Sequence, residues 1–122
     1  MHELSIALSI IEGVEQELAH RNNAHVAAVH LKLGPLSGVV KDALLFSYQL
    51  ACEDTLLAGS KLEIEEMPIV VFCQVCQQER PAASLQNLSC AVCETPSADV
   101  RGGAELEVVA LELSDEHAAA LG

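Results

Sequence analysis

The chain has 122 residues, which is enough for one domain or for a compact domain that carries a small metal-stabilised lobe. About half of the residues are apolar but aromatic residues are nearly absent, so the core must be built from Leu, Ile, Val and Ala. Six basic residues against eighteen acidic ones give a formal charge of −12, which repels phosphate backbones and excludes nucleic acid as an expected partner. No apolar run reaches the roughly 18 residues that a membrane-spanning helix needs.

The N-terminal segment predicts an amphipathic helix that begins almost at residue 1 and ends near residues 22–23. It opens with His2 and Glu3 instead of a basic region, so it is not a signal peptide, and we expect a cytoplasmic protein. The apolar residues recur in steps of three and four, as on one face of a helix. This stripe consists of Leu4, Ala7, Ile11, Val14 and Leu18, widened by Leu8 and Ile10.

The next three elements predict a strand, a helix and a second strand. Residues 24–33 alternate with a period of two and end at Gly34-Pro35, which indicates a strand. Its expected inner face consists of Ala27, Val29, Leu31 and Leu33. A helix is expected over residues 39–54, with an apolar side formed by Val40, Ala43, Leu44, Ser47, Leu50 and Ala51. Residues 62–65 alternate again, and the whole segment forms a right-handed crossover if the two strands are parallel.

Residues 69–103 form an insert that contains four cysteines, two of the four prolines and few large apolar side chains. Such a segment buries too little surface to order itself, so we expect bound metal to supply the missing stability. A third strand is expected over residues 105–113. Its alternation changes phase between Val108 and Leu111, which indicates a bulge or burial on both faces.

The four cysteines form two short repeats, Cys73-Gln-Val-Cys76 and Cys90-Ala-Val-Cys93. Two such turns place four thiolates around one point, the arrangement that binds a tetrahedral Zn(II) ion. Because all four positions are cysteine, no coordination site stays open for a catalytic water, and the zinc is expected to be structural. A structural disulfide pair, a redox-active C-x-x-C motif and an iron–sulfur cluster are the alternatives. We expect Val75 and Val92 to shield the metal, and Cys52 to be a small buried apolar residue.

The terminal residues Met1-His2-Glu3 are a second candidate metal site. The α-amine of Met1, the backbone nitrogen and Nδ1 of His2, and the amide nitrogen of Glu3 together form a planar set of four nitrogen donors. Ni(II) and Cu(II) accept this geometry, whereas Zn(II) does not prefer it. An ordinary solvated terminus is the competing interpretation. The other histidines lack ligand spacing and are expected to be surface or hydrogen-bonded residues: His20, His25, His30 and His117.

Taken together, these motifs resemble the HypA/HybF family of hydrogenase nickel-incorporation proteins. The resemblance covers essentially the whole chain. It rests on the opening Met-His-Glu-Leu-Ser, on Gly-Pro-Leu-Ser-Gly-Val at residues 34–39, on Leu-Glu-Ile-Glu at residues 62–65 and on the paired C-x-x-C motifs. It implies an α+β fold in which two helices pack on a small mixed three-stranded sheet, with an inserted four-cysteine zinc lobe. The implied division is a nickel-binding domain at residues 1–68 and 104–122 and a zinc lobe at residues 69–103.

The resemblance also implies a nickel metallochaperone and not an enzyme. It would carry Ni(II) as cargo and deliver it to the large-subunit precursor of nickel–iron hydrogenase, together with a nickel-binding GTPase. On this chain His2 would be the side-chain nickel ligand and Met1 would supply its α-amine. Glu3 would supply its backbone nitrogen, or would influence the nickel ligands without binding the metal itself. The zinc ligands would be Cys73, Cys76, Cys90 and Cys93. Weak homodimer formation is compatible with the sequence.

Two other functions are to be separated from this one. A zinc-ribbon module for protein interaction would keep the four cysteines but would not deliver nickel. A thiol–disulfide oxidoreductase would need an exposed cysteine of low pKa beside positive charge, and only Arg80 and Arg101 lie near the cysteines in sequence. Family members often have a histidine in or beside the zinc lobe that joins the nickel site. This chain has no histidine between His30 and His117.

Overall fold

The structure, a computed structural model, describes residues 3–21 and 24–115. By its contacts the chain divides into two compact units. The first comprises Met1–Leu31, Val40–Ile64 and Val108–Gly122, and the second comprises Lys32–Val39 and Glu65–Glu107. The sequence suggests a division by bound metal instead, into a nickel-binding domain at residues 1–68 and 104–122 and a zinc lobe at residues 69–103. This division stays a prediction.

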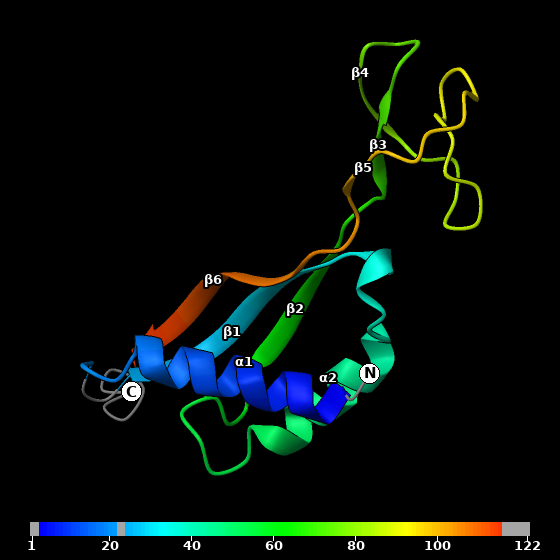
Figure 1. Ribbon diagram of the computed structural model, residues 1–122. Coiled ribbons are helices and arrows are strands. Elements are labelled where there is room, and N and C mark those ends of the chain that lie inside the picture. The colour runs from blue at the N-terminus through cyan, green and yellow to red at the C-terminus, as the bar shows by residue number, and fades with distance from the viewer. Residues whose placement is uncertain (1–2, 22–23, 116–122) are drawn as a thin grey trace. The chain divides into compact units, whose positions relative to one another are not determined.

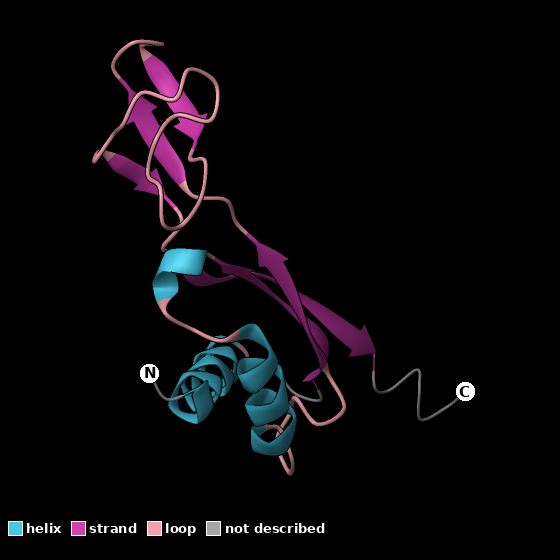
Figure 2. Ribbon diagram, turned by 90° about the vertical axis from the view of Figure 1, so that its right-hand side faces the viewer, coloured by secondary structure: helices cyan, strands magenta, loops and turns pink. Residues whose placement is uncertain are grey.

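Two helices of the first unit, α1 (Glu3–Glu17) and α2 (Lys41–Ala51), contact each other and lie on the same side of a sheet (Figure 1 and Figure 2). None of the helices in the described part of the chain is long and apolar enough to cross a membrane. The buried side of α1 consists of Ala7, Ile10, Ile11 and Val14, followed by Leu18 just after the helix. Leu4 and Leu8 are each 50% exposed, so the prediction that they belong to the buried stripe is wrong.

The buried face of α2 also differs from the prediction. It consists of Leu44 and Tyr48, with the buried Cys52 at the C-cap, and these three residues repeat every four positions. Val40, Phe46 and Leu50 are more than half exposed, so the prediction that Val40 and Leu50 line the buried side is wrong. The Tyr48 hydroxyl lies 2.7 Å from Ser60 Oγ, which gives this phenol a polar partner and explains why the helix turns Tyr48 inward. The prediction that Cys52 is buried is confirmed.

The sheet has the strand order β2-β1-β6. Its strands are β1 (Ala24–Leu33), β2 (Lys61–Glu66) and β6 (Leu106–Asp115). Backbone hydrogen bonds join Val26 to Leu56 and Leu33 to Met67, so β1 and the β2 segment run in the same direction. His25 and Gly34 are hydrogen bonded to Ser114 and Glu105, respectively, so β6 runs in the opposite direction. The sheet is therefore mixed, as the α+β prediction requires.

Burial along β1 changes phase within the strand. Val26 and Ala28 are buried while Ala27 is exposed, and from Val29 onward the odd-numbered residues are buried. The prediction that Ala27 lies on the inner face is therefore wrong, and the residues from Val29 follow the predicted pattern. In the edge strand β6, the side chains of Val108 and Val109 are 39% and 48% exposed. Because neighbouring residues of a strand point to opposite faces, the predicted alternative of burial on both faces of this strand is wrong.

The second unit contains a sheet of its own, with the strand order β4-β3-β5. Its elements are β3 (Val70–Cys73), β4 (Gln78–Pro81), β5 (Val100–Gly102) and the 3-10 helix Pro35–Ser37. Both β4 and β5 pair antiparallel with β3. The sequence did not predict this sheet, because its strands have only three or four residues and the exposed polar β4 lacks an apolar face.

Candidate metal centre

The first cysteine turn connects β3 to β4. Cys73 is the last residue of β3 and pairs with Gln78, the first residue of β4. Between them the chain turns so that Cys76 N–H donates to Cys73 Sγ at 3.3 Å and Gln77 N–H donates to Cys73 O at 2.8 Å. Backbone donors directed at sulfur stabilise a thiolate, so the turn prepares Cys73 for a cation.

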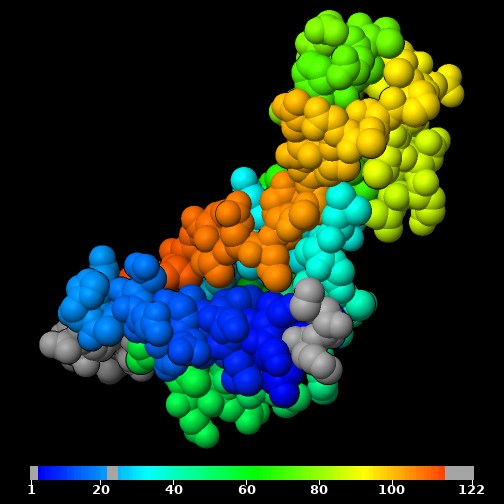
Figure 3. All heavy atoms as spheres, in the orientation of Figure 1, coloured from blue at the N-terminus to red at the C-terminus, as the bar shows by residue number. Residues whose placement is uncertain are grey.

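The second turn repeats this geometry at Cys90. Cys93 N–H donates to Cys90 Sγ at 3.4 Å, and Glu94 N–H donates to Cys90 O at 2.8 Å. An isolated bridge between Ser89 and Pro96 closes the second turn, and a bridge between Ala82 and Cys90 holds that turn beside the end of β4. The β3–β4 hairpin (green) and the second turn (yellow) lie against each other in the space-filling view (Figure 3). The short repeat in the sequence is therefore also a repeat in structure.

The two turns bring all four cysteine sulfurs to one place. The Sγ atom of Cys73 lies 3.5 Å from that of Cys93, and the Sγ atom of Cys76 lies 4.0 Å from Cys90 and 3.8 Å from Cys93. All four atoms lie within 4.8 Å of one another. A tetrahedron with metal–sulfur bonds of about 2.3 Å has edges of about 3.8 Å, so the sulfur positions fit a single Zn(II) ion. A disulfide needs about 2.05 Å, and the cysteines are free thiols.

The four thiols differ in their surroundings. Cys73 and Cys90 are buried, whereas Cys93 is exposed. Hydrogen bonds from the Thr95 side chain, whose Oγ1 lies 3.1 Å from the sulfur, and from the Thr95 backbone lower the pKa of Cys93 to about 6. The Arg80 side chain lowers the pKa of Cys76, but burial and the neighbouring thiols outweigh it and raise that pKa to about 11. Cys76 and Cys93 therefore differ in how strongly they hold their protons, and a cation bound by the cluster would displace these protons.

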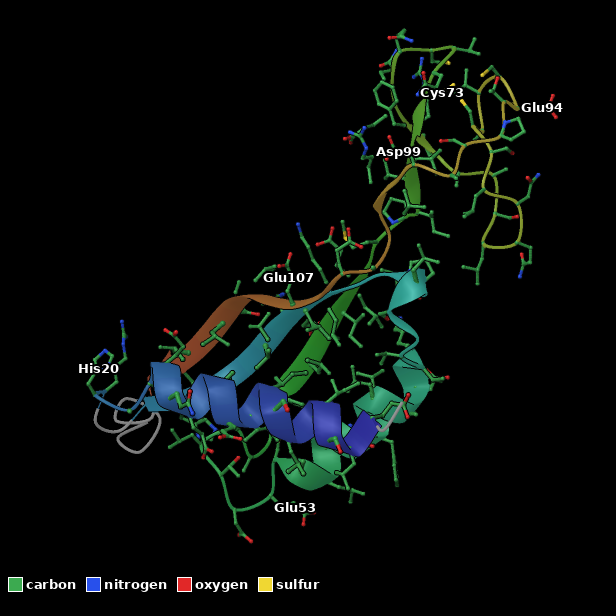
Figure 4. All side chains as sticks on the ribbon, viewed as in Figure 1. His20, Glu53, Cys73, Glu94, Asp99 and Glu107 are labelled. Carbon is green, nitrogen blue, oxygen red and sulfur yellow. The ribbon has the colours of Figure 1, made fainter. Side chains whose placement is uncertain are left out.

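The residues around the turns correct one prediction. Val75 is 66% and Val92 61% exposed, so the prediction that they shield the metal is wrong. The residue after each second cysteine has a left-handed backbone, with φ of 57° at Gln77 and 62° at Glu94. Glycine adopts this conformation most easily, and the turns form here without it. Cys73 and Glu94 both lie on the lobe that carries the thiols (Figure 4).

Of the predicted N-terminal site, only Glu3 falls within the part of the chain that the structure describes; Met1 and His2 lie outside it. Glu3 is the first residue of α1. Its backbone N–H belongs to the first turn, where no carbonyl of the same helix is available as an acceptor. Its carboxylate Oε2 accepts a hydrogen bond of 3.2 Å from Val40 N–H, at the N-cap of α2.

Among the described residues, the four cysteines are the one group of three or more His, Cys, Asp or Glu side chains close enough to share a metal ion. His20 is exposed just beyond α1, and His30 Nε2 lies 2.7 Å from Glu112 Oε2 across β1 and β6. His117 lies outside the described residues. Sequence reasoning missed Thr95 as a partner of the Cys93 thiol. Its position two residues beyond Cys93 was the one signal in the sequence that could have identified it.

Comparisons with known proteins agree with this arrangement. The family model described as hydrogenase/urease nickel incorporation, metallochaperone, hypA matches residues 1–113. A hydrogenase maturation factor HypA from a Roseiflexus species (strain RS-1) is 43% identical over 116 residues, covering 95% of this chain and 94% of the relative. The corresponding factor from Chloroflexus aurantiacus is 46% identical over 112 residues, covering 92% and 98%.

Solved structures support the fold alone. The solution structure of the Ni metallochaperone HypA from Helicobacter pylori has a TM-score of 0.64 and 21% identity, covering 93% of this chain and 97% of that one. A second solution structure of a HypA protein has a TM-score of 0.68 at 21% identity, covering 94% and 98%. On the family match and these relatives, the chain belongs to the HypA family of nickel-incorporation metallochaperones, which are hydrogenase maturation factors and not enzymes.

Proposed function

We propose that this protein binds Ni(II) at its N-terminus and delivers it to the large-subunit precursor of nickel–iron hydrogenase, while the four cysteines hold a structural Zn(II). The observation that carries the proposal is the family match over residues 1–113, because it includes both Met1-His2-Glu3 and the two cysteine turns. The nickel ligands are the α-amine of Met1, the backbone nitrogen and Nδ1 of His2, and the amide nitrogen of Glu3.

The start of α1 supports the assignment of the Glu3 amide nitrogen. Coordination through an amide nitrogen requires that its proton leave, and a first-turn N–H can lose its proton without breaking a helical hydrogen bond. Two amide protons, those of His2 and Glu3, leave when these nitrogens bind the metal. Their loss offsets the two positive charges of Ni(II), so the complex adds little charge to the positive end of the helix dipole.

The cysteine site is assigned to zinc on the chemistry of its donors. Four thiolates saturate a tetrahedral ion, and thiolates together with this geometry select Zn(II) over a planar Ni(II) ion. The zinc then stabilises the lobe at residues 69–103 and leaves no position for cargo. Residues 1–68 and 104–122 form the nickel-binding domain in this proposal.

The partners follow from the family. Nickel passes to the large-subunit precursor with the help of a nickel-binding GTPase, in the cytoplasm, and weak self-association is compatible with this role. Because the chain carries a formal charge of −12, electrostatic attraction favours partner surfaces that are basic.

A transfer experiment tests delivery. Untagged protein loaded with radioactive nickel is mixed with the GTPase and the nickel-free precursor, and nickel in the precursor is measured after separation. The matched control carries a Gly-Ser extension before Met1, which removes the α-amine from its position and leaves every other side chain in place. We expect transfer from the native chain alone. Equal transfer from both proteins would disprove the terminal nickel site.

A further inference from the structure

The strand β6 forms one edge of the mixed sheet, and its outer side has no partner strand among the described residues. The strand order β2-β1-β6 gives β6 a single neighbour, β1, and Figure 1 shows β6 at the margin of the sheet. An edge strand presents a row of unpaired backbone N–H and C=O groups, which can pair with another extended chain. The part of β6 that belongs to the first unit, residues 108–115, is long enough for such pairing.

The opposite edge of the same sheet is protected against pairing, whereas β6 is not. The strand β2 has six residues with the sequence Lys-Leu-Glu-Ile-Glu-Glu, and its charged residues Lys61 and Glu63 are exposed. Short length and charged side chains, above all lysine, keep the edges of natural sheets from pairing. The strand β6 has ten residues without Lys, Arg or Pro, and its residues 108–111 are Val-Val-Ala-Leu. Of the two edges, β6 is therefore the one at which another chain can add.

Exposed apolar side chains accompany the unpaired edge of β6. Val108, Val109 and Leu113 are all exposed. Because neighbouring residues of a strand point to opposite faces, Val108 and Val109 place an exposed valine on each face of β6. The atoms of this strand (orange) also lie at the surface in the space-filling view (Figure 3). A strand added beside β6 would cover both valines with its own side chains.

The charge along β6 decides which kind of chain fits this edge. Glu112 contacts His30 of β1 at 2.7 Å, and its side chain nevertheless remains mostly exposed. The strand has no cation of its own, and the chain as a whole has a formal charge of −12. Opposite charges on paired strands attract and like charges repel, so a second copy of this chain is disfavoured at this edge. A segment that carries Lys or Arg would instead be attracted to it.

We propose that the outer edge of β6, at residues 108–115, binds an extended segment of a partner protein in which apolar residues alternate with Lys or Arg. The backbone of this segment pairs with β6 and extends the sheet by one strand. Its apolar side chains cover the valine on one face, and the aliphatic stems of its basic side chains cover the valine on the other. The charged ends of these stems lie near acidic side chains such as Glu112. Neither metal takes part in this contact, which is therefore separate from nickel delivery.

A peptide-binding experiment tests the proposal on zinc-loaded, nickel-free protein. The probe is a fluorescent synthetic peptide of about six residues in which Val and Lys alternate. Its matched control has the same side chains and charge, but every backbone nitrogen is methylated, so it has no N–H donors for pairing. Binding is measured by fluorescence anisotropy, and amide hydrogen exchange followed by NMR identifies the protected residues. We expect protection of β6 amides, and binding of the methylated peptide that is about tenfold weaker or more, because several hydrogen bonds are lost.

Two protein variants with the same change of charge distinguish the two edges of the sheet. Glu112→Lys reverses a charge on β6, and Glu63→Lys makes the same reversal on β2. We expect Glu112→Lys to bind the peptide about tenfold more weakly than Glu63→Lys, because it places like charges beside each other. Val109→Thr keeps a β-branched residue but removes part of the apolar contact, and it should also weaken binding.

Several results would overturn the proposal. Absence of binding, or equal binding of the two peptides, would show that backbone pairing does not occur. Equal weakening in Glu112→Lys and Glu63→Lys, or protection of β2 amides in place of β6, would reduce the effect to general attraction by an acidic protein. Protection of β6 amides that rises with protein concentration without peptide would assign the edge to a second copy of the chain. If a lysine variant does not fold, Glu112→Gln and Glu63→Gln replace the pair, and equal binding by these two would overturn the role of the charge.

Discussion

Glu3 and Val40 join the start of one helix to the start of the other. The Glu3 carboxylate, in the first turn of α1, accepts a hydrogen bond from Val40 N–H at the N-cap of α2. Val40 has no polar side chain, and α2 has no side-chain cap of its own. An acidic side chain at this place satisfies a free backbone donor and interacts favourably with the positive end of the helix dipole. The terminal motif therefore also has a structural role.

Replacing Glu3 tests that role. Glu3→Ala removes the acceptor, and we expect the free energy of unfolding to fall by about 1 kcal/mol, as for the loss of an N-cap. Glu3→Gln keeps an oxygen acceptor without the charge and should retain part of the stability. Thermal unfolding of the zinc-loaded protein measures both. A Glu3→Ala protein as stable as wild type would show that the contact contributes nothing.

Gly34 is a position where a side chain does not fit. A Cβ atom there would lie 2.1 Å from the carbonyl oxygen of Gly103 and 2.6 Å from Glu105 Oε1. The two chain segments meet this closely because Gly34 N–H donates to Glu105 O and Leu36 N–H donates to Gly103 O. We expect Gly34→Ala to destabilise the fold by about 1–3 kcal/mol or more. Gly13→Ala is the matched control, since a Cβ at that residue meets nothing within 4 Å.

The left-handed residue after the second cysteine turn offers a stabilising change. Glu94 has φ of 62°, which is unfavourable for a residue with a Cβ, so Glu94→Gly should raise the free energy of unfolding by about 0.5–1 kcal/mol. Glu94→Ala removes the same negative charge but keeps the Cβ, and the difference between the two variants isolates the backbone term. Urea unfolding of the zinc-loaded proteins provides the comparison. Equal stability of the Gly and Ala variants would contradict the strain.

The features that could be predicted from the sequence are those that depend on residues close together in the chain. The two helices, the strands of the mixed sheet and the two C-x-x-C turns follow from periodicity and spacing, since each is defined by residues a few positions apart. Leu8 and Phe46 illustrate the limit: both are apolar at helical positions, and both are exposed because the neighbouring elements cover a different side of each helix. Arg80 illustrates it again, because its place on the same face of the hairpin as Cys73 follows only from the pairing of β4 with β3.

The affinity for nickel should rise as the pH rises. The proposed ligands bind after an amine with a pKa of about 8 and an imidazole with a pKa of about 6.5 lose their protons. Binding therefore releases protons, and affinity should rise between about pH 5 and 8 and be weak below about pH 6. Equilibrium dialysis across this range measures the effect, with the Gly-Ser-extended protein as the control. A flat profile would exclude this set of ligands.

The central claim is that nickel and zinc bind at separate sites, and metal quantification on untagged His2→Ala tests it most directly. Nickel and zinc per chain are measured by mass spectrometry after dialysis against nickel, for wild type, His2→Ala and the control His20→Ala, which changes an exposed histidine elsewhere. We predict one nickel and one zinc for wild type and His20→Ala, and zinc alone for His2→Ala. Full nickel binding by His2→Ala would contradict the account and favour a zinc-ribbon interaction module.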